Sequence, residues 1–189
     1  MKKKLLLVLT IVLMIGMLAG CGGPKLEGKT LVYGSGDYTA INPALYEHGE
    51  INSLIFLGLT AHDGENKVVP GAAEVWKFDD KTNTYTFKIR EGLAFHDGDD
   101  LTAEDAEFTI KAIMDPANGS ENASNFEDVV RVEATDDLTL ELELSAPNVA
   151  MPDYLTIGIL PKHLLEGKDM TVDSFNQQPV GPTHPSGCS

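Results

Sequence analysis

The sequence is poor in cysteine and in basic residues. Two cysteines occur in 189 residues, and 14 lysines and arginines face 29 aspartates and glutamates, which gives a formal net charge of −15. Two cysteines do not make a disulfide framework. Nucleic-acid phosphates demand Lys and Arg on the protein. The acidic balance therefore excludes nucleic acid as the expected partner.

Signatures of catalysis and of metal binding are also missing. The five histidines, at positions 48, 62, 96, 163 and 184, are scattered, and the sequence lacks the two closely spaced pairs of His or Cys that a zinc site requires. Neither a GxSxG nucleophile motif nor a dinucleotide-binding fingerprint is present. We therefore expect no enzyme, no cofactor and no metal site.

Long hydrophobic runs are absent except at the N-terminus. Lys2, Lys3 and Lys4 precede an apolar run over residues 5–18 that is shorter than the roughly 20 residues of a membrane-spanning helix. A basic start, a short apolar core and small residues at its end are typical of a secretory signal peptide. We predict a signal peptide at residues 1–20; an uncleaved anchor helix is the alternative.

Residues 18–21, Leu-Ala-Gly-Cys, resemble the bacterial lipobox, in which the cysteine thiol receives a diacylglycerol and the chain is cut before it. The resemblance implies lipidation of Cys21, with residues 21–29 as the lipidated N-terminus and a linker. Loss of residues 1–20 would remove three lysines and take the net charge to about −18. The expected location is extracytoplasmic, anchored by lipid to the bacterial cell membrane, at its periplasmic face or outer surface.

The rest of the chain alternates between strand and helix patterns. A strand is predicted at residues 29–33, and two β-hairpins at 77–90 and 130–144, where apolar and polar residues alternate around turn residues. A helix is predicted at residues 44–59 from its apolar spacing. With the helices described next, the fold class is α+β.

Two further helices are indicated by their first residues. Thr102 is placed to cap a helix that ends at Asp115-Pro116, and Pro161 begins a short helix. Ahead of Thr102, residues 96–100 (HDGDD) look like a calcium loop but lack the order of ligands and the bidentate Glu at the twelfth position. A polar turn before a capped helix is the favoured interpretation.

The motifs between residues 69 and 114 resemble those of a known family. They read VPGAAEVW from Val69, TYTFKIREG from Thr84, FHDG from Phe95 and LTAED from Leu101, and ILPKHLL from Ile159 agrees with them. Together they resemble family 5 of the bacterial extracellular solute-binding proteins, which serve ABC importers of oligopeptides, dipeptides and nickel. The resemblance runs from about residue 30 to residue 180.

This resemblance implies a receptor with two lobes, an extra subdomain on the larger one, and a ligand in the cleft between them. Residues 30–180 would be the N-terminal part of that domain: a periplasmic-binding-protein-like type II lobe with the extra subdomain, α/β in the full-length family, and with the second lobe missing. Residues 181–189 depart from the family pattern. We expect them to be an atypical tail produced by a frameshift or truncation, and the DNA after codon 181 is the observation that bears on this.

The implied ligand contacts lie in the loop after the first strand, where backbone groups are free. They are Gly34, Ser35, Gly36, Asp37 and Tyr38. Backbone capture suits varied peptides, which share N–H and C=O groups. The implied function is capture of oligopeptides or dipeptides by a monomer that delivers them to the permease subunits of an ABC importer. A nickel or other metal complex is the alternative ligand; a lipid-tethered enzyme or adhesion domain, or a truncated non-binding fragment, are the alternative classes.

Overall fold

The computed structural model describes residues 40–46 and 49–183. The strand predicted at residues 29–33, the loop 34–38 and Cys21 lie outside these residues. The elements, in chain order, are α2 (Gly49–Ile55), β1 (Thr60–His62), β2 (Val68–Pro70), β3 (Ala73–Asp79), β4 (Thr84–Ile89), α3 (Ala103–Met114), β5 (Val129–Asp136), β6 (Thr139–Leu144), α4 (Met151–Tyr154) and α5 (Lys162–Leu165), with 3-10 turns at Pro116–Asn118, Ala123–Phe126 and Ser174–Asn176. The α+β class is confirmed.

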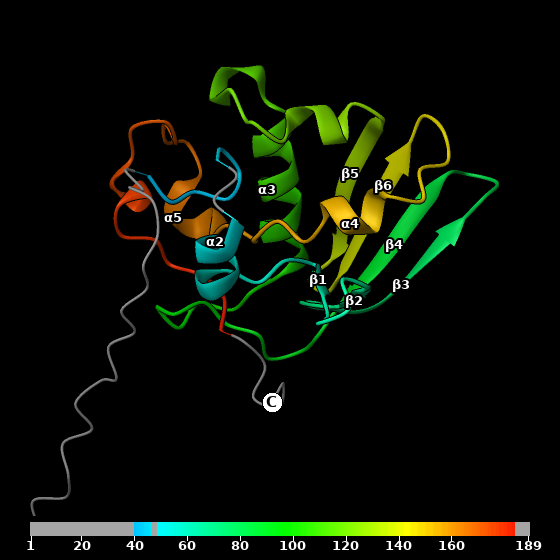
Figure 1. The fold of residues 1–189 in the computed structure, drawn as a ribbon, viewed down its shortest axis with the longest axis horizontal. Coiled ribbons are helices and arrows are strands. Elements are labelled where there is room, and N and C mark those ends of the chain that lie inside the picture. Colours follow the sequence, from blue (N-terminus) through cyan, green and yellow to red (C-terminus); the bar gives the residue numbers. More distant parts are fainter. Residues whose placement is uncertain (1–39, 47–48, 184–189) are drawn as a thin grey trace, which may run out of the picture. The chain divides into compact units, whose positions relative to one another are not determined.

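Four of the strands form one antiparallel sheet in the order β3-β4-β6-β5 (Figure 1). Its two outer pairs are the two predicted hairpins, which are thereby confirmed. The hairpins join through β4 and β6, where Phe87 lies opposite Leu140 and Tyr85 opposite Leu142. A separate two-stranded ladder pairs β1 with β2.

The predicted alternation gives the sheet one buried and one wet face. Phe87, Leu140 and Leu142 are fully buried. Their sequence neighbours on the opposite face are polar, and Arg131 there reaches carboxylates of β5 and β6. Successive strand residues point to opposite sides, so this alternation fixes which face receives the helix.

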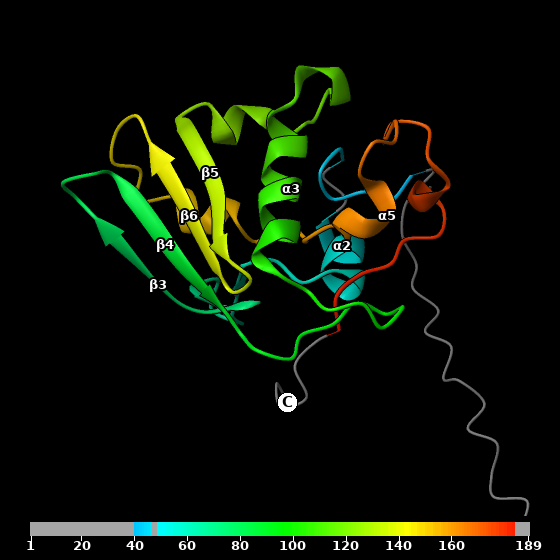
Figure 2. The same ribbon diagram turned by 180° about the vertical axis from the view of Figure 1, so that it is seen from behind.

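Helix α3 packs on β5 and β6 and, on its other side, against α5. Figures 1 and 2 show it standing between the sheet and the short helices α2 and α5. Thr102 is its N-cap, as predicted, and the Thr102 backbone N–H donates to Oδ2 of Asp105 at 2.9 Å. The helix ends at Asp115, before Pro116, because proline disfavours the helical conformation of the residue before it.

The helix predicted over residues 44–59 is wrong in extent, because among the described residues of this range only Gly49–Ile55 is helical. At its start, Asn42 holds a turn: its Oδ1 accepts from the Ala44 N–H and its carbonyl from the Tyr46 N–H. At its end the backbone leaves the helix to bond elsewhere, since the carbonyl of Leu57 accepts from the Ile159 N–H at 3.0 Å. Long-range pairing therefore replaces the helix that the apolar spacing predicted.

The segment predicted to be an atypical tail is described as far as Thr183. Its Gly181 carbonyl accepts from the His96 N–H at 2.9 Å, and the Thr183 N–H donates to the Ala94 carbonyl at 2.7 Å. Pro182 forms a β-bridge with Phe95. Residues 181–183 thus run antiparallel to residues 94–96.

Two side chains of α3 hold the backbone that leads into α5. Oγ1 of Thr109 accepts from the Leu160 N–H at 2.8 Å, and Oδ1 of Asp105 accepts from the Lys162 N–H at 2.9 Å. Thr109 also donates to the carbonyl of Asp105 at 2.7 Å, so its hydroxyl both donates and accepts. Thr109, Asp105 and Leu160 are all buried, and a buried N–H without an acceptor is costly.

The bond from Leu160 to Thr109 can be removed almost without changing shape. We expect Thr109→Val to lower the free energy of unfolding by about 1–3 kcal/mol, because the Leu160 N–H loses its acceptor in a buried place. Thr86→Val, on the wet face of β4, is the matched control and should change it by less than about 0.5 kcal/mol. Urea denaturation measures both. Equal effects of the two variants would contradict the assigned role of Thr109.

Candidate functional site

Two glycines bring distant backbone segments into contact beside α2. Gly58 and Gly158 form an antiparallel bridge. A Cβ on Gly58 would lie 2.6 Å from the Thr156 carbonyl carbon, and one on Gly158 would lie 2.2 Å from Cβ of Phe56. Any side chain at either position would force the two segments apart, so glycine is required for this close approach.

An open hollow of about 840 Å³ lies along this contact. Its walls come from α2, from β1, from residues 122–125 and from the segment that runs from α4 to Gly158. The wall at β1 is held in place by a hydrogen bond, because Oγ1 of the buried Thr60 donates to the Pro152 carbonyl at 2.6 Å. Concave features of this kind are the default places for ligands.

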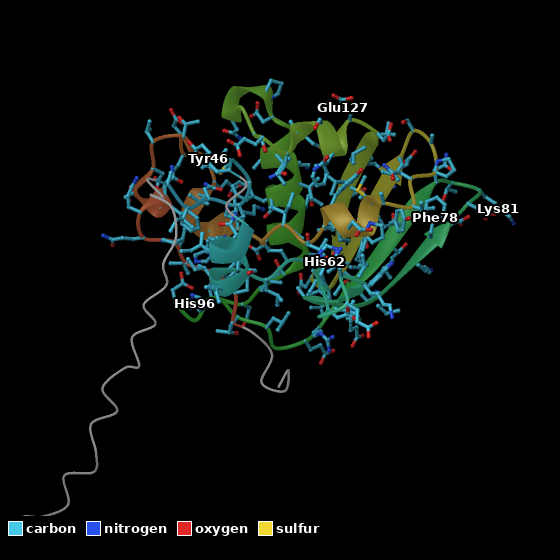
Figure 3. All side chains as sticks on the ribbon, in the orientation of Figure 1. Tyr46, His62, Phe78, Lys81, His96 and Glu127 are labelled. Carbon is cyan, nitrogen blue, oxygen red and sulfur yellow. The ribbon has the colours of Figure 1, made fainter. Side chains whose placement is uncertain are left out.

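One contact between titratable side chains lies in the hollow. Nε2 of His62 is 3.0 Å from Oδ1 of Asp153, with side chains 33% and 50% exposed. Figure 3 shows His62 at β1, well separated from Lys81 at the tip of the β3–β4 hairpin. None of the described residues that line the hollow is Lys or Arg. Its fixed charge is therefore the carboxylate of Asp153.

Aromatic and amide groups complete the lining. Tyr46, Phe56 and Tyr154 contribute rings, and Asn52 contributes an amide. The Asn52 Nδ2 group donates to the Tyr46 carbonyl at 3.3 Å, whereas Asn52 Oδ1 is buried and has no hydrogen-bond partner among the described residues. A buried acceptor without a partner is uncommon, and because this oxygen has no exposed surface it does not face the hollow.

The hollow offers one carboxylate, an imidazole, amides, hydroxyls and rings, which are groups by which proteins hold small ligands. Within residues 40–46 and 49–183, no three His, Cys, Asp or Glu side chains gather as a metal site. No helix in the same residues is long and apolar enough to cross a bilayer.

A second polar cluster lies in the loop that resembled a calcium site. Nε2 of His163 is 2.9 Å from Oδ2 of Asp97, and its Nδ1 is 3.1 Å from Oδ2 of Asp99. The ring also packs against Phe95, with centroids 5.7 Å apart. Because carboxylates accept only, both nitrogens bond at once when the ring carries two protons. The residues form a turn that fastens α5, which confirms the favoured interpretation.

The contact with His163 also changes the chemistry of one carboxyl group. The hydrogen bond from the His163 ring lowers the pKa of Asp97 below its ordinary value, and the backbone N–H of Asp99 acts in the same direction. A hydrogen bond to the charged form favours ionisation. The cluster therefore contributes to stability while Asp97 is ionised.

The predicted ligand loop, Gly34, Ser35, Gly36, Asp37 and Tyr38, and the predicted lipid site Cys21 lie outside the described residues. The hollow was not predicted from the sequence. His62 and Asp153 stand 91 positions apart, and neither lies in a recognisable motif. The roles of Gly58 and Gly158 could not be predicted from the sequence either, because a single sequence does not show which glycines allow two backbones to approach closely.

Comparison with known proteins identifies the family. Residues 67–186 match the family model described as bacterial extracellular solute-binding proteins, family 5 Middle. The match covers more than half of the chain, so the chain belongs to this family, whose members bind solutes and are not enzymes. The family inferred from the motifs is confirmed.

Three relatives illustrate the likeness. Protein XP55 of Streptomyces lividans is 30% identical over 161 residues, covering 85% of this chain and 30% of the relative. The structure of NikZ from Campylobacter jejuni in complex with Ni(L-His) is 37% identical, with a TM-score of 0.74, over 77% of this chain and 30% of NikZ.

The third relative is AppA of Bacillus subtilis, an oligopeptide-binding protein. Its sequence is 29% identical over 95% of this chain and 38% of AppA. Its structure in complex with a nonapeptide has a TM-score of 0.70 and 27% identity, over 77% of this chain and 31% of AppA. The chain therefore spans between 30% and 38% of the length of these relatives.

The lowered pKa of Asp97 predicts a pH dependence of stability. A depressed carboxyl pKa stabilises the fold above the unfolded value of about 4, and this stability is lost as the pH falls through the lower folded value. Between these values the unfolded chain binds more protons. We expect the free energy of unfolding to fall more steeply in this range for the wild type than for Asp97→Asn, measured by urea denaturation in small pH steps. Parallel curves would contradict the assignment.

Proposed function

We propose that this chain is part of an extracytoplasmic receptor that captures oligopeptides or dipeptides for uptake by an ABC importer. The observation that carries the proposal is membership of the solute-binding family together with the likeness to AppA, an oligopeptide-binding protein whose structure holds a nonapeptide. A receptor of this kind performs no chemistry. Its permease subunits are the proposed protein partners, and the receptor itself acts as a monomer.

The proposed arrangement places the described residues in a type II lobe with its extra subdomain, within a solute-binding domain that begins near residue 30 and includes residues up to 180. The loop of residues 34–38 supplies backbone groups to the peptide, because the main chain is what varied peptides share. The hollow beside α2 and β1 adds a concave, mixed polar and aromatic surface. This function is that of the whole receptor. The relatives are about three times as long as this chain.

A nickel complex is the second candidate ligand. The likeness to NikZ, at 37% identity and a TM-score of 0.74, favours it, and that structure holds Ni(L-His). No group of three metal-ligating side chains lies in the part of the chain described here. A metal that arrives already bound by histidine needs fewer ligands from the protein, so this alternative is tested together with peptides.

Binding of peptides is expected to raise the melting temperature of the full chain, purified in mild detergent. A ligand present at 100 times its Kd stabilises the folded state by about 2.7 kcal/mol. Di-, tri- and nonapeptides are the probes, free amino acids are the controls, and Ni(L-His) is the second arm. Stabilisation by Ni(L-His) alone would favour the alternative ligand, and no stabilisation by any probe would contradict the proposed function.

The proposed location depends on the N-terminus. We propose that residues 1–20 are removed as a signal peptide, that Cys21 then carries lipid, and that residues 21–29 form the linker to the receptor. More than one acyl chain is needed for stable anchoring, because a single chain binds membranes only marginally.

Replacement of Cys21 tests this location. Cys21→Ser should shift the protein from the membrane fraction to the soluble extracytoplasmic fraction, because the thiol that receives the lipid is lost. Cell fractionation measures the shift, and mass spectrometry of the N-terminal peptide measures the lipid. Cys188→Ser is the matched control and should stay with the membrane. Membrane retention of Cys21→Ser would contradict lipid anchoring.

A further inference from the structure

We propose that the hollow beside α2 and β1 binds a positively charged group of the peptide, an ammonium or a guanidinium. The inference rests on the proposed function and adds to it a preference among peptides. It concerns the hollow of about 840 Å³ and not the loop of residues 34–38. The carboxylate that would recognise the cation is that of Asp153 in α4, beside His62 of β1.

The charge in the hollow has one sign. Asp153 is its carboxylate, and no described Lys or Arg side chain lines the hollow to neutralise it. Oδ1 of Asp153 lies 3.0 Å from His62, whereas Oδ2 has no hydrogen bond or ion pair with any described residue. The contact with Nε2 of His62 occupies Oδ1 alone. Oδ2 is therefore available to accept from a cationic N–H.

The remaining lining also favours a cation. The rings of Tyr46 and Tyr154 present faces with negative charge density, to which ammonium and guanidinium groups are attracted. A ligand carboxylate would instead meet the like charge of Asp153, with no described Lys or Arg side chain in the hollow to hold it. The free carboxyl end of a peptide is thus expected to lie outside the hollow.

The test compares peptides that differ only in charge. Acetyl-Ala-Arg-Ala and acetyl-Ala-citrulline-Ala have nearly the same shape, and only the first carries a side-chain cation. Ala-citrulline-Ala with a free amino terminus, compared with its acetylated form, tests the amino-terminal ammonium as the source of the cation. Affinities are measured by isothermal titration calorimetry on the full chain in mild detergent.

The variants isolate Asp153. Asp153→Asn keeps the size and an oxygen for His62 but removes the charge at a half-exposed position. Asp80→Asn removes the same charge from the exposed turn between β3 and β4, next to Lys81 at the hairpin tip (Figure 3). In the wild type and in Asp80→Asn, at least one cationic peptide should bind about fivefold more tightly than its neutral partner, and Asp153→Asn should lose this preference.

Each of the other outcomes overturns either the inference or the proposed function. Peptides that bind the wild type equally with and without the cation overturn the inference and leave the proposed function standing. A preference that survives in Asp153→Asn places the cation elsewhere and overturns it too. If Asp153→Asn loses affinity for all peptides equally and has a lowered melting temperature, Asp153 is structural. This result also overturns the inference. Failure of every peptide to bind the wild type overturns the proposed function itself.

Discussion

Thr109 and Asp105 on α3 accept hydrogen bonds from the backbone N–H groups of Leu160 and Lys162, and the rest of the described structure depends on this attachment. It ties the helix that covers the sheet to a segment more than 50 positions later in the chain. Ile159, beside Leu160, donates its N–H to Leu57, so the same segment also holds the end of α2. Residues 159–162 are thus bonded both to α3 and to the segment that follows α2.

The hollow is a consequence of this arrangement. Gly58 and Gly158 let two backbones lie in contact, and β1 and α4 then extend from them so that His62 meets Asp153. The resulting surface is concave and carries one carboxylate. These properties are those of a place where a solute is held, which agrees with membership of a solute-binding family.

The sequence predicted the elements whose pattern is local. The hairpin around residues 79–84 follows from alternation that places Tyr85 and Phe87 on one face, and α3 follows from Thr102 and Pro116. The same reasoning could not find the pairing of β4 with β6. Those strands belong to two separate hairpins, and the pattern within one hairpin does not show how it aligns with the other. It overextended α2, because Leu57 and Leu59 suit a helix face equally well and are buried here in a non-helical segment. The hollow needed pairs such as His62 and Asp153, which no spacing in the sequence reveals; the family was found because its motifs are contiguous.

Amide hydrogen exchange at Leu160 and Lys162 tests the central claim most directly. Buried N–H groups whose acceptors belong to α3 exchange only when the helix separates from the segment. The account predicts that both amides exchange at the slow rate of the central sheet amides, such as those of Phe87 and Leu140. Fast exchange of Leu160 and Lys162 while the sheet stays protected would show that the segment detaches alone, and would contradict the account.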